Sequence, residues 1–258
     1  MNLFYDRRFG MRLTVQFQTI HEPLILPLNY QECLQGFLYR SLKDPSFSSF
    51  LHDKGFQKGK RSFKLFTFSR LFGEHTINRQ EKTIKYHQTI TWHIGSVMPK
   101  LIQMLGEYFL LHGEEIVLNG QPLQIVKIEV DNVEINEKSY VIEMLSPITV
   151  YSTYEQTDGT KKTHFFSPYD EVFSTMVENN FCNKYEAFYG KKPTTRLTLT
   201  PIEIKPNYKV VTTFKGFRIT AWQGRFQLTS SPEQIQFVYG SGLGSRNSQG
   251  FGMFRIIE

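Results

Sequence analysis

The stretch Gly-Ser-Gly-Leu-Gly-Ser-Arg-Asn-Ser-Gln-Gly-Phe-Gly, residues 240–252, is the most specific feature of the 258-residue chain. Five of its thirteen positions are glycine. Glycine adopts positive φ and allows another backbone to approach closely. The stretch therefore predicts a loop that presents successive backbone N–H groups, with Ser245, Arg246, Asn247 and Ser248 as its polar side chains. Such an array suits phosphate and ribose, although a purely structural turn would show the same pattern.

Two well-known phosphate motifs do not fit this loop. No Gly-Lys-Ser/Thr follows it, which excludes a Walker loop. It also stands between a short predicted helix, opened by Ser231-Pro232, and a final predicted strand at 251–257. A dinucleotide fingerprint would instead open a strand-helix-strand unit.

The segments before the loop follow an order that occurs twice. In the second half, apolar alternation and turn residues predict strands at 140–151, 196–204, 209–214 and 217–228, and a helix that starts near Ser167-Pro168 and Asp170 and closes at Gly190. In the first half they predict strands at 11–20, 63–72, 83–94 and within 114–130, with a loop rich in Ser, Gly and Lys after Pro45. Helices are predicted from Tyr30 to about Lys43, capped by Asn29, and from Ser96 to about Leu111.

Strand, helix, strand, strand, helix, strand is the order of a ferredoxin-like fold, an antiparallel sheet covered by helices on one face. The sequence thus predicts an α+β protein with two tandem ferredoxin-like (RRM-like) domains, at residues 11–130 and 139–258. Only the order of elements repeats, because the two halves share no visible sequence repeat. Residues 1–10 are predicted to be a short leader outside the core.

Composition and charge narrow the class of partner. The net charge is +6 and 15% of the residues are aromatic, which favours a packed protein that meets a polyanion: nucleic acid, anionic lipid or acidic protein. Two cysteines, Cys33 and Cys182, argue against a disulfide framework and a cysteine zinc site. No apolar run is long enough to span a bilayer, and a reducing cytoplasm is the expected location.

The loop contains two glycine triplets, Gly242-Leu243-Gly244 and Gly250-Phe251-Gly252, separated by five residues. This pattern resembles the C-terminal signature of the CRISPR-associated endoribonucleases that process precursor CRISPR RNA (Cas protein six), which belong to the RAMP superfamily. The resemblance covers essentially residues 11–258. It continues in order through segments that begin at Leu34, Phe50, Lys64, Leu145, Tyr189 and Thr220. It implies two ferredoxin-like domains, and cleavage of the repeat by the RNA's own 2′-hydroxyl without a metal or other cofactor.

Cleavage of that kind needs a base, a cation at the phosphorane and an acid for the departing 5′-oxygen. The resemblance places the catalytic residues at Tyr39, His52 and Lys64, with His52 in proton transfer and Lys64 at the phosphate. Without the resemblance, His52 reads as a surface histidine, Tyr39 as a half-exposed residue and Lys64 as a solvated charge. Lys60 and Arg61 compete with Lys64 for its role.

Candidate RNA-binding residues come from the glycine loop and from the basic segment near Lys64. They are Gly242, Gly244, Ser245, Arg246, Asn247, Ser248, Gly250, Gly252, Lys60 and Arg61. The expected partner is CRISPR repeat RNA, with an RNA-guided interference complex and a homodimer as further candidates and no membrane. Two alternatives remain open: a non-cleaving repeat-binding protein of the same architecture, and a ferredoxin-like protein that binds another anion.

Overall fold

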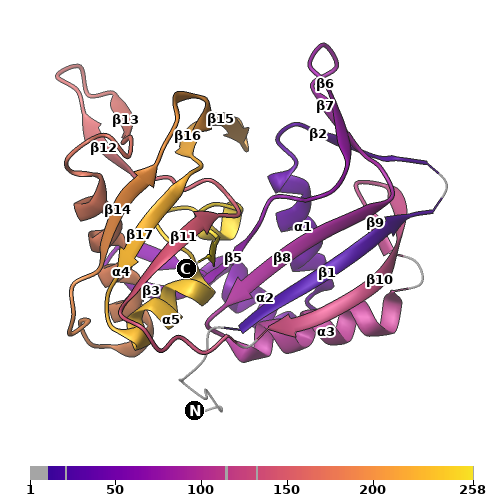
Figure 1. The fold of residues 1–258 in the computed structure, drawn as a ribbon, viewed down its shortest axis with the longest axis horizontal. Coiled ribbons are helices and arrows are strands. Elements are labelled where there is room, and N and C mark those ends of the chain that lie inside the picture. Colours follow the sequence, from indigo (N-terminus) through magenta and orange to yellow (C-terminus); the bar gives the residue numbers. More distant parts are fainter. Residues whose placement is uncertain (1–10, 21, 114–115, 132, 258) are drawn as a thin grey trace.

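The computed structural model describes residues 11–20, 22–113, 116–131 and 133–257. Two antiparallel sheets lie side by side, and helices cover one face of each (Figure 1). The predicted leader at residues 1–10 lies outside the described residues. Within the described part of the chain, no helix is long and apolar enough to cross a membrane.

The N-terminal half is built on a sheet with the strand order β5–β8–β1–β10–β9. Apolar alternation turns Leu13, Val15 and Phe17 of β1 into the core. There the Phe17 ring meets Phe37 and Phe109 of the two covering helices, each at 6.4 Å between centroids. The elements are β1 (Met11–Thr19), α1 (Gln31–Ser41), β5 (Phe66–Phe68), β8 (Thr89–Ser96), α3 (Pro99–His112), β9 (Ile116–Leu118) and β10 (Gln121–Asp131).

The C-terminal half repeats this plan with the strand order β14–β17–β11–β18. Phe173 of its long helix stacks on Phe226 of β17, with 6.3 Å between centroids. That helix ends where Gly190 adopts φ +70°, as glycine after a helix predicts. The elements are β11 (Ser139–Met144), α4 (Phe173–Tyr189), β14 (Thr198–Glu203), β17 (Arg225–Thr229), α5 (Pro232–Ser241) and β18 (Phe254–Ile256).

Smaller elements extend from these two layers. They are the three-stranded β2 (Leu24–Pro27), β7 (Thr83–Tyr86) and β6 (His75–Asn78), and the hairpins β3 (Phe56–Lys58) with β4 (Arg61–Phe63), β12 (Tyr151–Glu155) with β13 (Lys161–Phe165), and β15 (Lys209–Phe214) with β16 (Phe217–Trp222). Short helical turns complete the list: α2 (Pro45–Ser49), η1 (Phe50–Lys54), η2 (Pro206–Tyr208) and η3 (Asn247–Gln249).

Several predicted boundaries are wrong, for local reasons. The predicted strand 83–94 breaks at Gln88, where φ is +53°, and 217–228 breaks at Gly224, where φ is +141°. The segment 140–151 divides between β11 and β12, and only Phe66–Phe68 of 63–72 is a strand. The helix predicted from Ser96 begins at Pro99, because the Ser96 hydroxyl accepts the Met98 N–H in the preceding turn.

Two predicted helix starts are also displaced. Tyr30 rather than Asn29 is the N-cap of α1, and its side chain makes no capping bond. The helix predicted from Ser167-Pro168 and Asp170 begins at Phe173, after a turn in which the Asp170 carboxylate accepts the Ser167 N–H.

The largest departure from the prediction is the segment after Pro45, which was expected to be a loop. It contains α2, a π-helical turn at Phe50–Lys54 and the β3–β4 hairpin. The Asp44 carboxylate caps α2 by accepting the Phe47 N–H at 3.0 Å. His52 therefore lies in a helical turn.

Contacts between the two halves join β1, β5 and β8 to the end of α5 and to the glycine loop. The buried Arg12 guanidinium lies 3.4 Å from the centroid of the Tyr239 ring and donates to the Tyr239 carbonyl at 2.9 Å. Gly95 of β8 faces the Gly240 carbonyl so closely that a Cβ would stand 3.1 Å from it. The Thr67 hydroxyl donates to the Phe251 carbonyl at 3.1 Å. These buried contacts fix the orientation of one sheet against the other.

Candidate functional site

The three residues expected to be catalytic lie together. Tyr39 comes from α1, His52 from the π-helical turn, and Lys64 from the segment between β4 and β5. The Tyr39 and His52 rings meet edge to face, with 5.4 Å between centroids. The Lys64 ammonium donates to the His52 main-chain carbonyl at 2.8 Å. Lys64 is not on a strand as predicted, since Leu65 after it has φ +52° and β5 begins only at Phe66.

Asp53 joins this cluster, and the sequence reasoning missed it. Its carboxylate accepts a hydrogen bond from His52 Nδ1 at 2.7 Å and from the Ser49 hydroxyl at 3.0 Å. The hydrogen bonds from His52 and then Ser49 hold the pKa of the Asp53 carboxyl below its usual value. An ionised Asp53 favours the tautomer with the proton on Nδ1, which leaves His52 Nε2 as the free nitrogen.

Electrostatics separate the roles of Tyr39 and Lys64. Burial, with the Asp53 charge as a second cause, raises the pKa of Tyr39 to about 12. The phenol therefore keeps its proton near neutrality and can donate a hydrogen bond. Burial lowers the pKa of Lys64, and the nearby Asp53 carboxylate opposes that change. The cluster thus holds a proton donor, an imidazole and an amine side by side.

The glycine loop is a packed structure at the junction of the two halves. Gly242, Gly244, Gly250 and Gly252 all have positive φ. A Cβ at Gly252 would stand 1.9 Å from the Leu243 carbonyl oxygen, and one at Gly250 would stand 2.5 Å from the Phe68 ring. Two glycines of the motif are therefore required by close packing within the protein itself.

A buried lysine holds the glycine loop in place through hydrogen bonds. Lys184 of α4 is 2% exposed, and its ammonium donates to the Gly242 carbonyl at 2.5 Å and to Asn247 Oδ1 at 3.0 Å. The Asn247 amide in turn donates to the Leu243 and Phe251 carbonyls, at 2.8 and 3.0 Å. Burial lowers the pKa of Lys184 to about 7. Lys184 and Asn247 together fix the backbone path of the loop.

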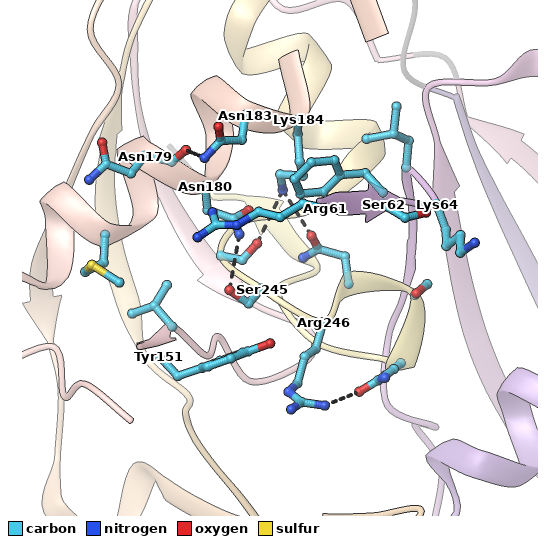
Figure 2. Close-up of a pocket in the computed structure, with 18 of the residues that line it drawn as sticks. Arg61, Ser62, Lys64, Tyr151, Asn179, Asn180, Asn183, Lys184, Ser245 and Arg246 are labelled. Atoms are coloured by element: carbon cyan, nitrogen blue, oxygen red, sulfur yellow. Dashed lines mark hydrogen bonds between the residues drawn. The ribbon is translucent and has the colours of Figure 1, made fainter. Parts of the chain in front are cut away.

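A cavity of about 840 Å³ opens beside the loop (Figure 2). We call it the junction cavity, since α4, the start of β12, the glycine loop and the segment from Arg61 to Leu65 line it. Its charged lining residues are Arg61, Lys64, Lys184 and Arg246, and the lining set contains no carboxylate. Lys64 belongs both to this cavity and to the Tyr39–His52 cluster. A hollow with only positive charges attracts a polyanion.

The predicted RNA-binding residues divide into two groups in the structure. Gly244, Ser245, Arg246, Asn247, Ser248 and Arg61 line the junction cavity. Gly242, Gly250 and Gly252 are buried in the loop's own packing, and exposed Lys60 lies in the turn between β3 and β4; these four do not line it. The buried amide of Asn247 is occupied by the loop itself.

The cavity also contains residues that the sequence reasoning missed. Tyr151 lies under the Arg246 guanidinium, 4.9 Å from ring centroid to carbon. Asn179, Asn180 and Asn183 of α4 form the opposite wall. Their helical spacing could have placed the three on one face, but only the folded chain sets that face against the loop. Among the described residues, no group of three His, Cys, Asp or Glu side chains is placed to hold a metal ion.

Two antiparallel sheets with helices on one face, joined by a glycine-rich loop over a basic cavity, define an α+β protein with a site for an anionic ligand between its halves. A solved structure described as a RAMP protein binding different RNA substrates superimposes with a TM-score of 0.80, at 22% identity, over 96% of this chain and all of that one. The sequence models for CRISPR associated protein Cas6 match residues 25–128 (N-terminal) and 129–256 (C-terminal). The chain belongs to the Cas6 family.

Two curated relatives carry the name CRISPR-associated endoribonuclease Cas6. The one from Methanocaldococcus jannaschii is 27% identical over 253 residues, which cover 97% of this chain and 94% of the relative. The one from Pyrococcus furiosus is 26% identical over 243 residues, which cover 90% of this chain and 83% of the relative. The similarity therefore extends through both halves of the chain.

Proposed function

We propose that this protein is a repeat-specific endoribonuclease that cuts precursor CRISPR RNA within the repeat. The 2′-hydroxyl of the RNA attacks the adjacent phosphate, which gives a 2′,3′-cyclic phosphate and a 5′-hydroxyl without a metal. One observation carries the proposal: Tyr39, His52 and Lys64 meet at the edge of a basic cavity that no carboxylate lines. Family membership supplies the substrate class, since the curated relatives are named as CRISPR-associated endoribonucleases.

In this proposal the two halves are tandem ferredoxin-like domains, at residues 11–130 and 139–258. The strand orders support it. In each half, the fourth strand of the βαββαβ unit lies beside the first, and the third separates the first from the second. The RNA backbone then lies at the junction, where Arg61, Arg246, Ser245 and Ser248 are available for phosphate and ribose.

Each member of the cluster has a distinct role. His52 takes the proton of the attacking 2′-hydroxyl at Nε2, because Nδ1 is bonded to Asp53, and the Tyr39 phenol gives its proton to the departing 5′-oxygen. Lys64 leaves the His52 carbonyl and places its positive charge beside the phosphorane. The test is to incubate the protein in EDTA with repeat RNA and to map both new ends. A 2′,3′-cyclic phosphate supports the proposal, and tight binding without a cut would favour the non-cleaving alternative.

Replacing Asp53 by Asn should slow single-turnover cleavage by roughly 10- to 100-fold while the Kd for repeat RNA stays unchanged. The amide offers His52 a weaker, uncharged partner, so the population with a free Nε2 falls. The pH profile of the rate should move as well, which a merely structural role would not produce. Glu137→Gln, which changes an exposed carboxylate between β10 and β11, is the matched control. An Asp53→Asn enzyme with the wild-type rate and profile would remove Asp53 from the mechanism.

Replacing Arg246 by Ala should weaken binding to repeat RNA and reduce the slope of log Kd against log salt concentration by about one. Arg246 is one of four basic residues that line the junction cavity, and among the described residues its guanidinium has no carboxylate partner. Arg196→Ala is the control, since that guanidinium pairs with Glu178 outside the cavity. Equal salt slopes for wild type and Arg246→Ala would show that Arg246 does not meet phosphate.

A further inference from the structure

The junction cavity has a neutral wall that phosphate binding does not explain. Met176, Asn179, Asn180 and Asn183 follow one another at intervals of three, one and three residues along α4 and all line the cavity. Figure 2 shows the asparagines on the side of the cavity opposite Tyr151 and Arg246. Carboxamides carry no charge, but each offers a donor pair and an acceptor. Such groups recognise the edges of bases rather than the charge of a backbone.

Two polar atoms on this cavity are buried without a partner among the described residues. They are Asn180 Oδ1, an acceptor, and Arg246 Nε, a donor. The Asn180 Nδ2 donates to the Ser245 hydroxyl at 3.2 Å, which orients the amide and leaves Oδ1 as its unused end. Buried polar atoms are nearly always hydrogen-bonded in folded proteins. A ligand that donates a hydrogen bond to Asn180 Oδ1 and accepts one from Arg246 Nε would satisfy both atoms.

An aromatic surface lies next to these atoms. The Arg246 guanidinium carbon is 4.9 Å from the Tyr151 ring centroid, and Tyr151 is half-buried at the start of β12. Unpaired RNA bases stack on tyrosine rings and on guanidinium planes. Both kinds of surface are present here, within one cavity and beside Lys64, which reaches the Tyr39–His52 cluster.

We propose that the junction cavity is a base-specific subsite that holds one unpaired nucleotide of the repeat RNA. The base stacks on Tyr151, and an amino group of the base donates to Asn180 Oδ1. The phosphates beside it meet Arg61 and Arg246. This inference rests on the proposed function and extends it, because it names the part of the substrate that confers specificity and the residues that recognise it. Because Lys64 lines the same cavity, the selected nucleotide lies close to the scissile bond in the sequence of the repeat.

The experiment combines single abasic sites in the repeat RNA with substitutions in the cavity. All proteins carry His52→Ala so that the RNA stays intact, and Kd is measured by fluorescence anisotropy. An abasic site at one position near the cut should weaken binding by roughly 10- to 100-fold. Tyr151→Ala should weaken binding of the intact RNA by a similar factor, yet change binding of that abasic RNA by less than about twofold. Asn180→Ala should reduce the preference for an amino-bearing base at that position.

Two further variants serve as controls. Tyr151→Phe keeps the ring and should bind the intact RNA as the parent does, which separates stacking from a loss of folding. Asn207→Ala removes an exposed asparagine outside the cavity and should change nothing. The subsite proposal is wrong if Tyr151→Ala weakens binding of the abasic RNA by the same factor as binding of the intact RNA. It is also wrong if Tyr151→Phe binds the intact RNA as weakly as Tyr151→Ala does, or if an abasic site at no position weakens binding. If the parent does not prefer the repeat to random RNA, the proposed function itself fails.

Discussion

His52→Ala is expected to slow single-turnover cleavage of repeat RNA by roughly 10²–10⁴-fold, the usual contribution of a positioned acid or base. The His52 side chain is 66% exposed and contacts the edge of the Tyr39 ring and the Asp53 carboxylate. Its loss should therefore leave the fold and the RNA affinity nearly unchanged. Quench-flow or manual time courses with end-labelled RNA, at protein in excess of RNA, give the rate of the cut itself.

His75→Ala is the matched control for that experiment. His75 is also exposed, and its Nδ1 donates to the Gly73 carbonyl at 2.9 Å, but it lies on β6 and not in the Tyr39–His52 cluster. It should cleave at the wild-type rate. If His52→Ala cleaves as fast as His75→Ala, another group moves the proton and the assignment of His52 is wrong.

Lys184→Met is expected to lower the free energy of unfolding by roughly 2–4 kcal/mol, because it leaves buried carbonyl oxygens without a donor. The Lys184 ammonium donates hydrogen bonds to the Gly242 carbonyl and to Asn247 Oδ1 at the centre of the glycine loop. Lys184→Met should also weaken RNA binding, since the backbone of the glycine loop is no longer held in one conformation. Urea unfolding followed by circular dichroism measures the stability, and Lys191→Met, an exposed lysine just past α4, is the control. Equal midpoints for the two variants would contradict the role of Lys184.

The pH dependence of the free energy of unfolding provides a second test of the role of Lys184. Burial lowers its pKa from 10.5 to about 7 in the folded chain. Between those values the unfolded chain binds the proton that the folded chain has released, so the Lys184 term makes stability rise as pH increases through this range. Lys184→Met should lose this increment, and the gap between the wild type and the variant should widen towards alkaline pH.

Much of the fold follows from patterns that depend only on nearby residues. Alternation in 11–20 predicted β1, because Leu13, Val15 and Phe17 must share the buried face of a strand. Gly190 marked the end of α4, since its left-handed conformation is cheap only for glycine. The interruptions at Gln88 and Gly224 were not predicted, because both neighbouring stretches keep a strand-like composition.

The site was only partly accessible to the same reasoning. Tyr39, His52 and Lys64 were singled out by a family resemblance, and the structure brings them together. Their surroundings were not predictable, because the π-helical turn that joins His52 to Asp53 lies in a polar segment with no clear period. Tyr151 and the α4 asparagines come from a different half of the chain. No local pattern reports a contact of that kind, which tertiary packing alone creates.

The central claim is that the RNA's own 2′-hydroxyl cuts one bond within the repeat without a metal. The most direct test uses end-labelled repeat RNA from the source genome, in EDTA, together with a series that carries a 2′-deoxy sugar at each nucleotide in turn. We predict one cut in the unmodified RNA, and its complete loss in the single RNA that lacks the 2′-hydroxyl beside the scissile phosphate. A cut that persists in every member of the series, or that needs added divalent metal, would contradict the account.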